Sequence, residues 1–335
     1  MPPDPYFSVI IPTRNREGML RRCLSALAEQ SIEASAAEII VVDDGSTGEP
    51  AAEIGSSAGA FPVSVLRQSR GGPGSARNSG AAVARGLYLA FAEDDVVPDA
   101  RWLECARVHL DETGADILEG RTVDAGTGKD IRSFEPSPRA SFIPCNLFVR
   151  RSLFERVGGY DPGFFDAATG LYFREDSDFG FRAIGTGARI QIARDVSVEH
   201  PSQFSDLASC LRHARRYIFD PLLCRKHPLL YRRMIEVKTL AGIPVHRPQH
   251  YASIAYLAAV AWTVVAALQG SWEDVAGGGI VALMLSTAIR YKYRGGRAFM
   301  LYRIGETAGF LALPLVYLAA LAKGSVRYRS YGALY

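Results

Sequence analysis

The chain has 335 residues, of which 48% are hydrophobic and 22% are charged. That length allows one large domain or two ordinary ones, and the composition excludes an intrinsically disordered chain. The five cysteines include no CxxC pair, which excludes a disulfide-rich scaffold, argues against a structural zinc site and favours reduced thiols.

The net charge of +3 conceals an uneven distribution along the chain. Residues 1–200 contain 21 basic and 29 acidic residues, whereas residues 201–335 contain 17 basic and 6 acidic residues. In the second part the basic residues are interspersed with long apolar runs. This pattern favours a membrane surface as a partner and argues against nucleic acid.

Strands and helices are predicted to alternate over the first half of the chain. Continuous apolar runs, typical of buried strands, cover residues 7–11, 38–42, 63–66 and 87–91. Apolar residues recur at helical spacing over residues 16–30, 73–85 and 98–111. Such alternation predicts an α/β fold with a mostly parallel sheet, in which ligands bind beyond the carboxyl ends of the strands.

After residue 115 the alternation of strands and helices is less regular. Strands are expected at 116–123 and 189–198, and a helix at 175–186. An amphipathic helix is expected at 205–219 because its apolar residues share one face.

The last 85 residues contain three apolar runs between basic flanks. Residues 251–269 form a 19-residue uncharged run, which is long enough to span a bilayer as a helix. The uncharged run 275–289 is shorter, and 304–322 has Pro314 near its centre. We expect the first two runs to span a membrane; the alternative is that these runs are buried helices of a soluble domain.

The charges between these runs predict their topology. The N-terminal residues contain no secretory signal, so the first part is expected in the cytosol. Residues 290–303 and the tail after Ala322 are basic and also belong in the cytosol by the positive-inside rule. The third run is therefore expected to fold back as a re-entrant hairpin near Pro314, or to span the membrane against that rule.

Carboxylates follow two of the predicted strands. Asp43 and Asp44 end the second strand, where they could accept hydrogen bonds from a base or a ribose or simply cap a turn. Glu93 and Asp95 follow the fourth strand, and clustered carboxylates of this kind suit Mg²⁺ or Mn²⁺. The alternative for the second cluster is a solvated acidic loop.

Three further motifs have both a structural and a functional interpretation. Residues 71–80 are glycine-rich and precede a helix, which suits a bound anion or a flexible turn. Glu175 and Asp176 open a helix, where they complement its dipole or accept a proton from a hydroxyl. His200 ends a strand and is either a metal ligand or a structural histidine.

Taken in order, these motifs resemble the family 2 glycosyltransferases with the GT-A fold. The matching stretches are SVIIPTRN at 8–15, VVDDGS at 41–46, ARNSG at 76–80 and FAEDD at 91–95, followed by Asn146, 150–151, 157–161, 175–176 and His200. The resemblance implies a Rossmann-like, mostly parallel GT-A catalytic domain at 1–204. An interfacial helical linker at 205–250 and a helical membrane region at 251–335 would follow.

The resemblance also implies roles for individual residues. Those expected to bind a nucleotide-sugar, with a UDP-sugar favoured, are Pro12, Arg14, Asp43, Asp44, Arg77, Asn78 and Asp94. Asp95 corresponds to the metal-binding aspartate of the family's DxD motif, Glu93 stands where that motif has its first aspartate, and His200 would complete a Mg²⁺ or Mn²⁺ site. Asp176 corresponds to the catalytic base, with Glu175 as the fallback.

The function implied is transfer of a single sugar, with inversion, from a nucleotide-diphosphate sugar to a hydroxyl of a lipid-linked or membrane-proximal acceptor at the cytoplasmic membrane. The QxxRW motif of processive members is absent from residues 211–217, which argues against a polymerase. Two alternatives remain: a sugar-nucleotide pyrophosphorylase, whose glycine-rich loop would follow the first strand, and a catalytically silent scaffold, which would release no nucleotide.

Overall fold

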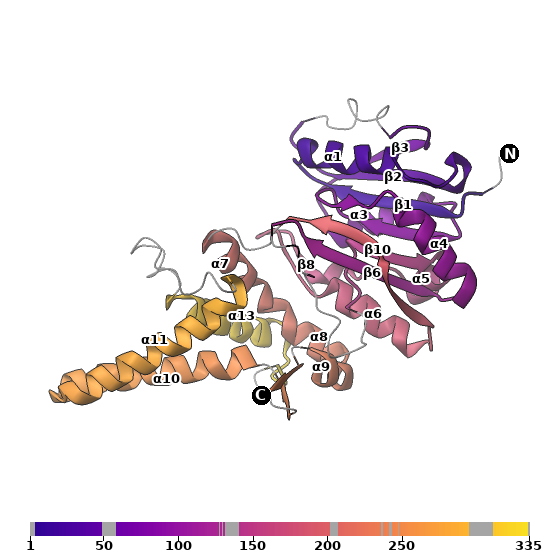
Figure 1. Cartoon of the computed structure of the whole chain (residues 1–335). Helices are drawn as coiled ribbons and strands as arrows, with labels where there is room; N and C mark the ends of the chain where they lie inside the picture. Colours follow the sequence, from indigo (N-terminus) through magenta and orange to yellow (C-terminus); the bar gives the residue numbers. More distant parts are fainter. Residues whose placement is uncertain are drawn as a thin grey trace. The chain divides into compact units, whose positions relative to one another are not determined.

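The computed structural model describes residues 4–48, 58–126, 128, 130, 141–201, 207–235, 237–240, 243–246, 248–294 and 311–333. The chain divides into two compact units, Met1–Ser202 and Gln203–Tyr335 (Figure 1).

The first unit is built on an eight-stranded sheet in the order β3-β2-β1-β4-β7-β6-β10-β5. Its strands are β1 Phe7–Thr13, β2 Ala37–Asp44, β3 Val63–Gln68, β4 Tyr88–Ala92, β5 Val97–Pro98, β6 Ile117–Asp124, β7 Asn146–Arg150 and β10 Ile190–His200. Strands β3, β2, β1 and β4 are parallel neighbours, and β6 is parallel to β10. The predicted α/β fold is confirmed, and β7, which the sequence analysis did not find, runs antiparallel between β4 and β6.

In the described part of this unit, five α-helices and a small hairpin accompany the sheet. They are α1 Glu17–Ala28, α3 Gly72–Val83, α4 Trp102–Thr113, α5 Arg151–Val157 and α6 Glu175–Gly185, with the hairpin strands β8 Phe165–Asp166 and β9 Leu171–Tyr172. Helix α4 begins later than the expected residue 98, because Val97 and Pro98 pair with β10 and a turn from Asp99 follows.

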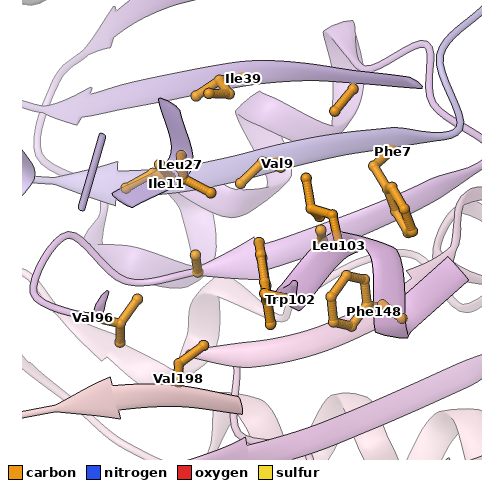
Figure 2. Packing of buried hydrophobic residues seen from close by; sticks show 14 of the residues in the cluster. Phe7, Val9, Ile11, Leu27, Ile39, Val96, Trp102, Leu103, Phe148 and Val198 are labelled. Carbon is orange, nitrogen blue, oxygen red and sulfur yellow. The ribbon is translucent and has the colours of Figure 1, made fainter. Parts of the chain in front are cut away.

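The core lies between the sheet and the helices that cover it. Successive side chains of a strand point to opposite faces, so one face of β1 presents Phe7, Val9 and Ile11. These residues share a buried cluster with Leu27 of α1 and Leu103 of α4 (Figure 2). Helix α3 also packs on β1 and β2. Close packing of this kind fixes the strands and therefore the positions of the residues that follow them.

A buried asparagine holds an irregularity in β10. The register of β10 against β6 shifts between Ala193 and Ser197. The side-chain amide of Asn146 donates to the carbonyl oxygens of Arg121 and Val196, both at 2.9 Å, and its oxygen accepts a bond of 2.8 Å from the indole of Trp102. Asn146 therefore satisfies buried polar groups around the bulge that precedes the end of β10.

We expect Asn146→Ala to destabilise the protein by about 3 to 5 kcal/mol, because it removes two buried hydrogen bonds and one part-buried hydrogen bond. The free energy of unfolding in urea measures this effect. Val108→Ala, at an exposed position of α4, serves as the control and should change that free energy by less than about 0.5 kcal/mol. Equal effects of the two substitutions would contradict the role of Asn146.

The second unit is mainly helical. Its elements are α7 Leu207–Arg216, α8 Asp220–Lys226, α9 Pro228–Met234, α10 Pro248–Gln269, α11 Trp272–Arg294 and α13 Leu313–Tyr328, with the hairpin strands β11 Val237–Leu240 and β12 Ile243–His246. The expected amphipathic helix at 205–219 appears as α7 followed by a 3-10 turn, Tyr217–Phe219, although residues 202–206 lie outside the described residues.

Among the described residues, α10 alone is long and apolar enough to cross a membrane, with 22 residues and a mean hydropathy of 1.8. The expected second span, 275–289, lies in α11, which does not meet the same criterion, so a multi-pass membrane protein is not supported. Of the expected third segment, 304–322, the part before residue 311 lies outside the described residues. From Leu313 the chain forms the 16-residue helix α13, with Pro314 in its first turn.

Candidate active site

Polar residues gather where three neighbouring strands of the sheet end. Thr13 ends β1, Asp44 ends β2, and Glu93 follows β4. Because these strands are parallel neighbours, their carboxyl ends lie along one edge of the sheet. In α/β sheets this edge is where ligands bind.

Asp43 presents a fixed and buried carboxylate at this edge. Its Oδ1 accepts hydrogen bonds from the backbone nitrogen of Ser46 at 2.9 Å and from the Ser46 hydroxyl at 2.6 Å. Its Oδ2 is buried without a hydrogen bond, and the nearest cation is Arg67 Nε at 3.5 Å. An unsatisfied acceptor is costly, so Oδ2 is suited to accept a hydrogen bond from a ligand N–H or hydroxyl.

Asp44 shapes the glycine-rich loop. Its carboxylate accepts hydrogen bonds from the side chain of Gln68 at 2.8 Å and from the backbone nitrogens of Gly71 at 2.7 Å and Gly72 at 2.8 Å. Gly72 has a φ of +84°, a conformation that side-chain-bearing residues rarely adopt. In this structure Asp44 therefore holds the start of α3 at the edge of the sheet.

Three further residues predicted for nucleotide binding, Pro12, Arg14 and Asn78, contact other parts of the protein in this structure. Pro12 pairs with Val42 inside the sheet, and Arg14 donates from Nε to the carbonyl of Gly45 at 3.3 Å. The amide of Asn78 donates to the carbonyl of Tyr160 at 2.7 Å and accepts from its backbone nitrogen at 2.8 Å. Asn78 thus fixes the chain at Tyr160.

Glu93, Asp95 and His200 form a cluster that fits a divalent ion. One potential ligand atom from each lies within 4.8 Å of the others. His200 Nδ1 is 2.6 Å from the carbonyl of Pro201, and Nε2 lies 3.3 Å from Glu93 and 3.5 Å from Asp95. Asp95 Oδ1 is buried without a hydrogen bond. Two carboxylates and an imidazole held in this way are a suitable donor set for Mn²⁺ or Mg²⁺.

The charges of the cluster influence one another strongly. Burial opposes the charge of Glu93, but the hydrogen bond with His200 and the charge of Arg77 outweigh it and lower the pKa of Glu93 to about 2. Burial likewise opposes the charge of His200, yet the two carboxylates raise its pKa to about 9. Burial and the charge of Glu93 raise the pKa of Asp95. The two carboxylates therefore favour a positive charge between them, which in this structure is the protonated His200.

Arg77 connects this cluster with the start of α6. Its side chain is buried, and Nη2 lies 3.2 Å from Glu93 while Nη1 lies 3.9 Å from Glu175. The guanidinium also lies over the ring of Tyr160, 5.6 Å from its centroid. Arg77 therefore links the cluster of Glu93, Asp95 and His200 with the start of α6.

Helix α6 brings two acids to the site in different surroundings. Glu175 is buried near Arg77, whereas Asp176 is only half-buried. Asp176 Oδ1 accepts a hydrogen bond of 2.6 Å from the backbone nitrogen of Ser177. The preceding residue, Arg174, has a φ of +72°, a strained conformation for a residue with a side chain. Asp176 is therefore the more accessible of the two candidate bases.

Sequence reasoning missed two residues that contact the acids after β4. The hydroxyl of Thr13 donates to Asp94 at 2.8 Å, and Arg16 Nη1 donates to Asp94 at 3.1 Å and to Asp95 at 2.9 Å. Burial raises the pKa of Asp94 to about 6 despite Arg16, which lowers it. For Arg16 the available signal was a second arginine three residues after the end of the first strand, at the same sheet edge as the acidic cluster.

Comparisons with known proteins agree on one family. The family model described as "Glycosyl transferase family 2" matches residues 8–178. The chain is 28% identical over 215 residues to glycosyltransferase AglE of Haloferax volcanii, covering 59% of this chain and 68% of that protein. It is 29% identical to the pre-mycofactocin glycosyltransferase of Mycobacterium tuberculosis, covering 58% of this chain and 42% of that protein.

Solved structures support the same fold. The mannosyltransferase PcManGT of Pyrobaculum calidifontis, in complex with GDP-Man and Mn²⁺, aligns with a TM-score of 0.64 at 20% identity, over 94% of this chain and 88% of that one. Residues 1–349 of S. aureus TarS in complex with UDP align with a TM-score of 0.51 at 17% identity, over 97% and 92% of the two chains. At these identities the likeness shows the fold alone.

Proposed function

The chain belongs to glycosyl transferase family 2, and we propose that it transfers a single sugar, with inversion, from a nucleotide-diphosphate sugar to a hydroxyl of a lipid-linked or membrane-proximal acceptor. The observation that carries the proposal is the grouping of Glu93, Asp95 and His200 at the sheet edge that also presents Asp43. A cluster suited to a divalent ion, beside a carboxylate oxygen of Asp43 that has no hydrogen bond, suits a ligand with a diphosphate and a hydrogen-bonding base.

Within this proposal, each group has a separate task. Asp43 Oδ2 accepts a hydrogen bond from the base or ribose, and Asp44 holds the glycine-rich loop against the nucleotide-sugar. Glu93, Asp95 and His200 would hold Mg²⁺ or Mn²⁺, which when bound neutralises the diphosphate leaving group. Asp176 takes the proton from the acceptor hydroxyl. The hydroxyl oxygen attacks the sugar from the face opposite the leaving diphosphate.

Two structural neighbours support a nucleotide-sugar as donor, because one was solved with UDP and the other with GDP-Man and Mn²⁺. We favour a UDP-sugar, because Asp43 and Asp44 resemble the pair that holds uracil and ribose in family members that use UDP-sugars. The deciding experiment incubates the purified chain with a panel of radiolabelled UDP- and GDP-sugars and a lipid extract. We expect acceptor-dependent release of free nucleotide and labelled lipid; a scaffold would release nothing, and a pyrophosphorylase would need pyrophosphate and release a sugar phosphate.

We also propose that α10 inserts into a membrane. Its 22 residues extend about 33 Å at 1.5 Å per residue, close to the thickness of a hydrocarbon core. Trp262, Val265 and Leu268 are exposed on it.

The test of this insertion is the double substitution Trp262→Asp and Val265→Asp. A charge in the membrane costs up to about 2.5 to 3.5 kcal/mol, the value at a helix centre, so with two charges most of the protein should move to the soluble fraction after cell lysis. Val108→Asp, at an exposed position of α4, is the control and should leave the distribution unchanged. Retention of the double variant in carbonate-washed membranes would contradict the insertion of α10.

A further inference from the structure

Arg16 contacts Asp95, one of the three residues proposed to hold the metal ion. Arg16 lies directly before α1, and its side chain is 49% exposed. From Nη1 it donates to Asp95 Oδ2 at 2.9 Å and to Asp94 Oδ1 at 3.1 Å. The other oxygen of Asp95 lies 3.5 Å from His200 Nε2. Arg16 therefore neutralises the same carboxylate that a divalent ion would require.

We propose that Arg16 is an internal counter-cation, which holds Asp95 until a divalent ion and a diphosphate arrive together and then transfers to the diphosphate. This inference rests on the proposed function. Two cations at one carboxylate repel each other, so Arg16 and the ion compete for Asp95 when the ion arrives alone. A diphosphate removes the competition, because guanidinium groups bind phosphate oxygens in bidentate fashion and the half-exposed side chain has room to move.

The competition predicts that a substitution near the metal site strengthens the binding of Mn²⁺. Arg16→Gln should bind Mn²⁺ alone more tightly than the wild-type chain, by about fivefold or more. In the wild-type chain, UDP or GDP should strengthen Mn²⁺ binding, and this enhancement should be smaller in Arg16→Gln. By reciprocity, Mn²⁺ should then strengthen nucleotide binding less in the variant than in the wild-type chain.

The experiment titrates the purified full-length chain with Mn²⁺ at constant ionic strength and measures free Mn²⁺ by electron paramagnetic resonance, with and without UDP or GDP. Arg85→Gln is the matched control. It removes the same charge from a side chain that is 48% exposed, but Arg85 pairs with Glu38. We expect Arg85→Gln to bind Mn²⁺ like the wild-type chain, and Arg16→Lys, which retains the cation, to remain close to it.

Several outcomes overturn the inference. If Arg16→Gln binds Mn²⁺ equally or more weakly, Arg16 does not compete with the ion. If Arg85→Gln strengthens the binding of Mn²⁺ as much as Arg16→Gln does, the effect comes from the overall charge of the protein. Asp95→Asn separates this inference from the proposed function: if wild-type binding does not depend on Asp95, the metal site itself is wrong. If binding requires Asp95 but is not strengthened by Arg16→Gln, the inference alone fails.

Discussion

Asp95→Asn is expected to reduce sugar transfer by about a thousandfold or more, because metal-ion stabilisation of a developing charge contributes several kcal/mol and each 1.4 kcal/mol is tenfold in rate. Asp95 is well suited to this role, since its Oδ1 is buried without a hydrogen bond and faces His200. Asparagine has nearly the same shape but lacks the charge. The rate is measured as nucleotide release with donor and acceptor both saturating.

Two controls separate the loss of a ligand from the loss of the fold. Asp111→Asn removes an exposed acid of α4 and should leave the rate unchanged. The thermal unfolding midpoint of Asp95→Asn should stay near that of the wild-type chain, or rise, because repulsion with Glu93 is relieved. EDTA should abolish wild-type activity and added Mn²⁺ or Mg²⁺ should restore it. Full activity in EDTA would reject the metal role of Asp95.

The sheet edge could be predicted because its signals are local. A buried parallel strand is a continuous apolar run, so the positions of Asp43 and Glu93 at strand ends followed from the sequence. The convergence of Glu93 with His200, 107 residues later, followed only from the resemblance to a family. The structure then explains it, because β5, which begins at Val97 shortly after Glu93, pairs with the end of β10 at Val198 and Glu199.

The roles of single polar residues could not be predicted, because they depend on partners far away in the sequence. Asn146 donates hydrogen bonds to the carbonyl oxygens of Arg121 and Val196, next to the bulge in β10. Nothing in the sequence indicated that Asn78 binds the backbone of Tyr160, 82 residues later; its place near the nucleotide-sugar stays a prediction. Hydropathy predicts that a segment is apolar, yet it gave two membrane-spanning runs where, among the described residues, one helix is long and apolar enough.

Asp176→Asn is expected to reduce turnover by at least about a hundredfold, the lower limit of what a positioned general base contributes. Asp176 and Glu175 are adjacent on α6, but their surroundings differ. Glu175 is buried, and its carboxylate lies 3.9 Å from Arg77. An acid that neutralises a buried arginine is poorly placed to accept a proton, because protonation would leave that cation uncompensated.

The opposing interpretation is that both acids merely complement the dipole of α6, which is worth only about 0.3 to 1 kcal/mol. The two substitutions distinguish these interpretations. Asp176→Asn should lower kcat and leave nucleotide-sugar binding, measured by calorimetry with the donor alone, nearly unchanged. Glu175→Gln should lower kcat less and weaken Mn²⁺ binding, since it disturbs the Arg77 that also contacts Glu93.

If Glu175→Gln lowers kcat more than Asp176→Asn does, Glu175 is the base. The assignment of Asp176 from the family motif would then be wrong. If neither substitution changes kcat by more than a few-fold, no general base acts from the start of α6. Asp178→Asn does not serve as a control, because its carboxylate binds Arg182, which also donates to the carbonyl of Gly159. Asp166→Asn, in the neighbouring hairpin, tests whether any acid near α6 produces the same loss.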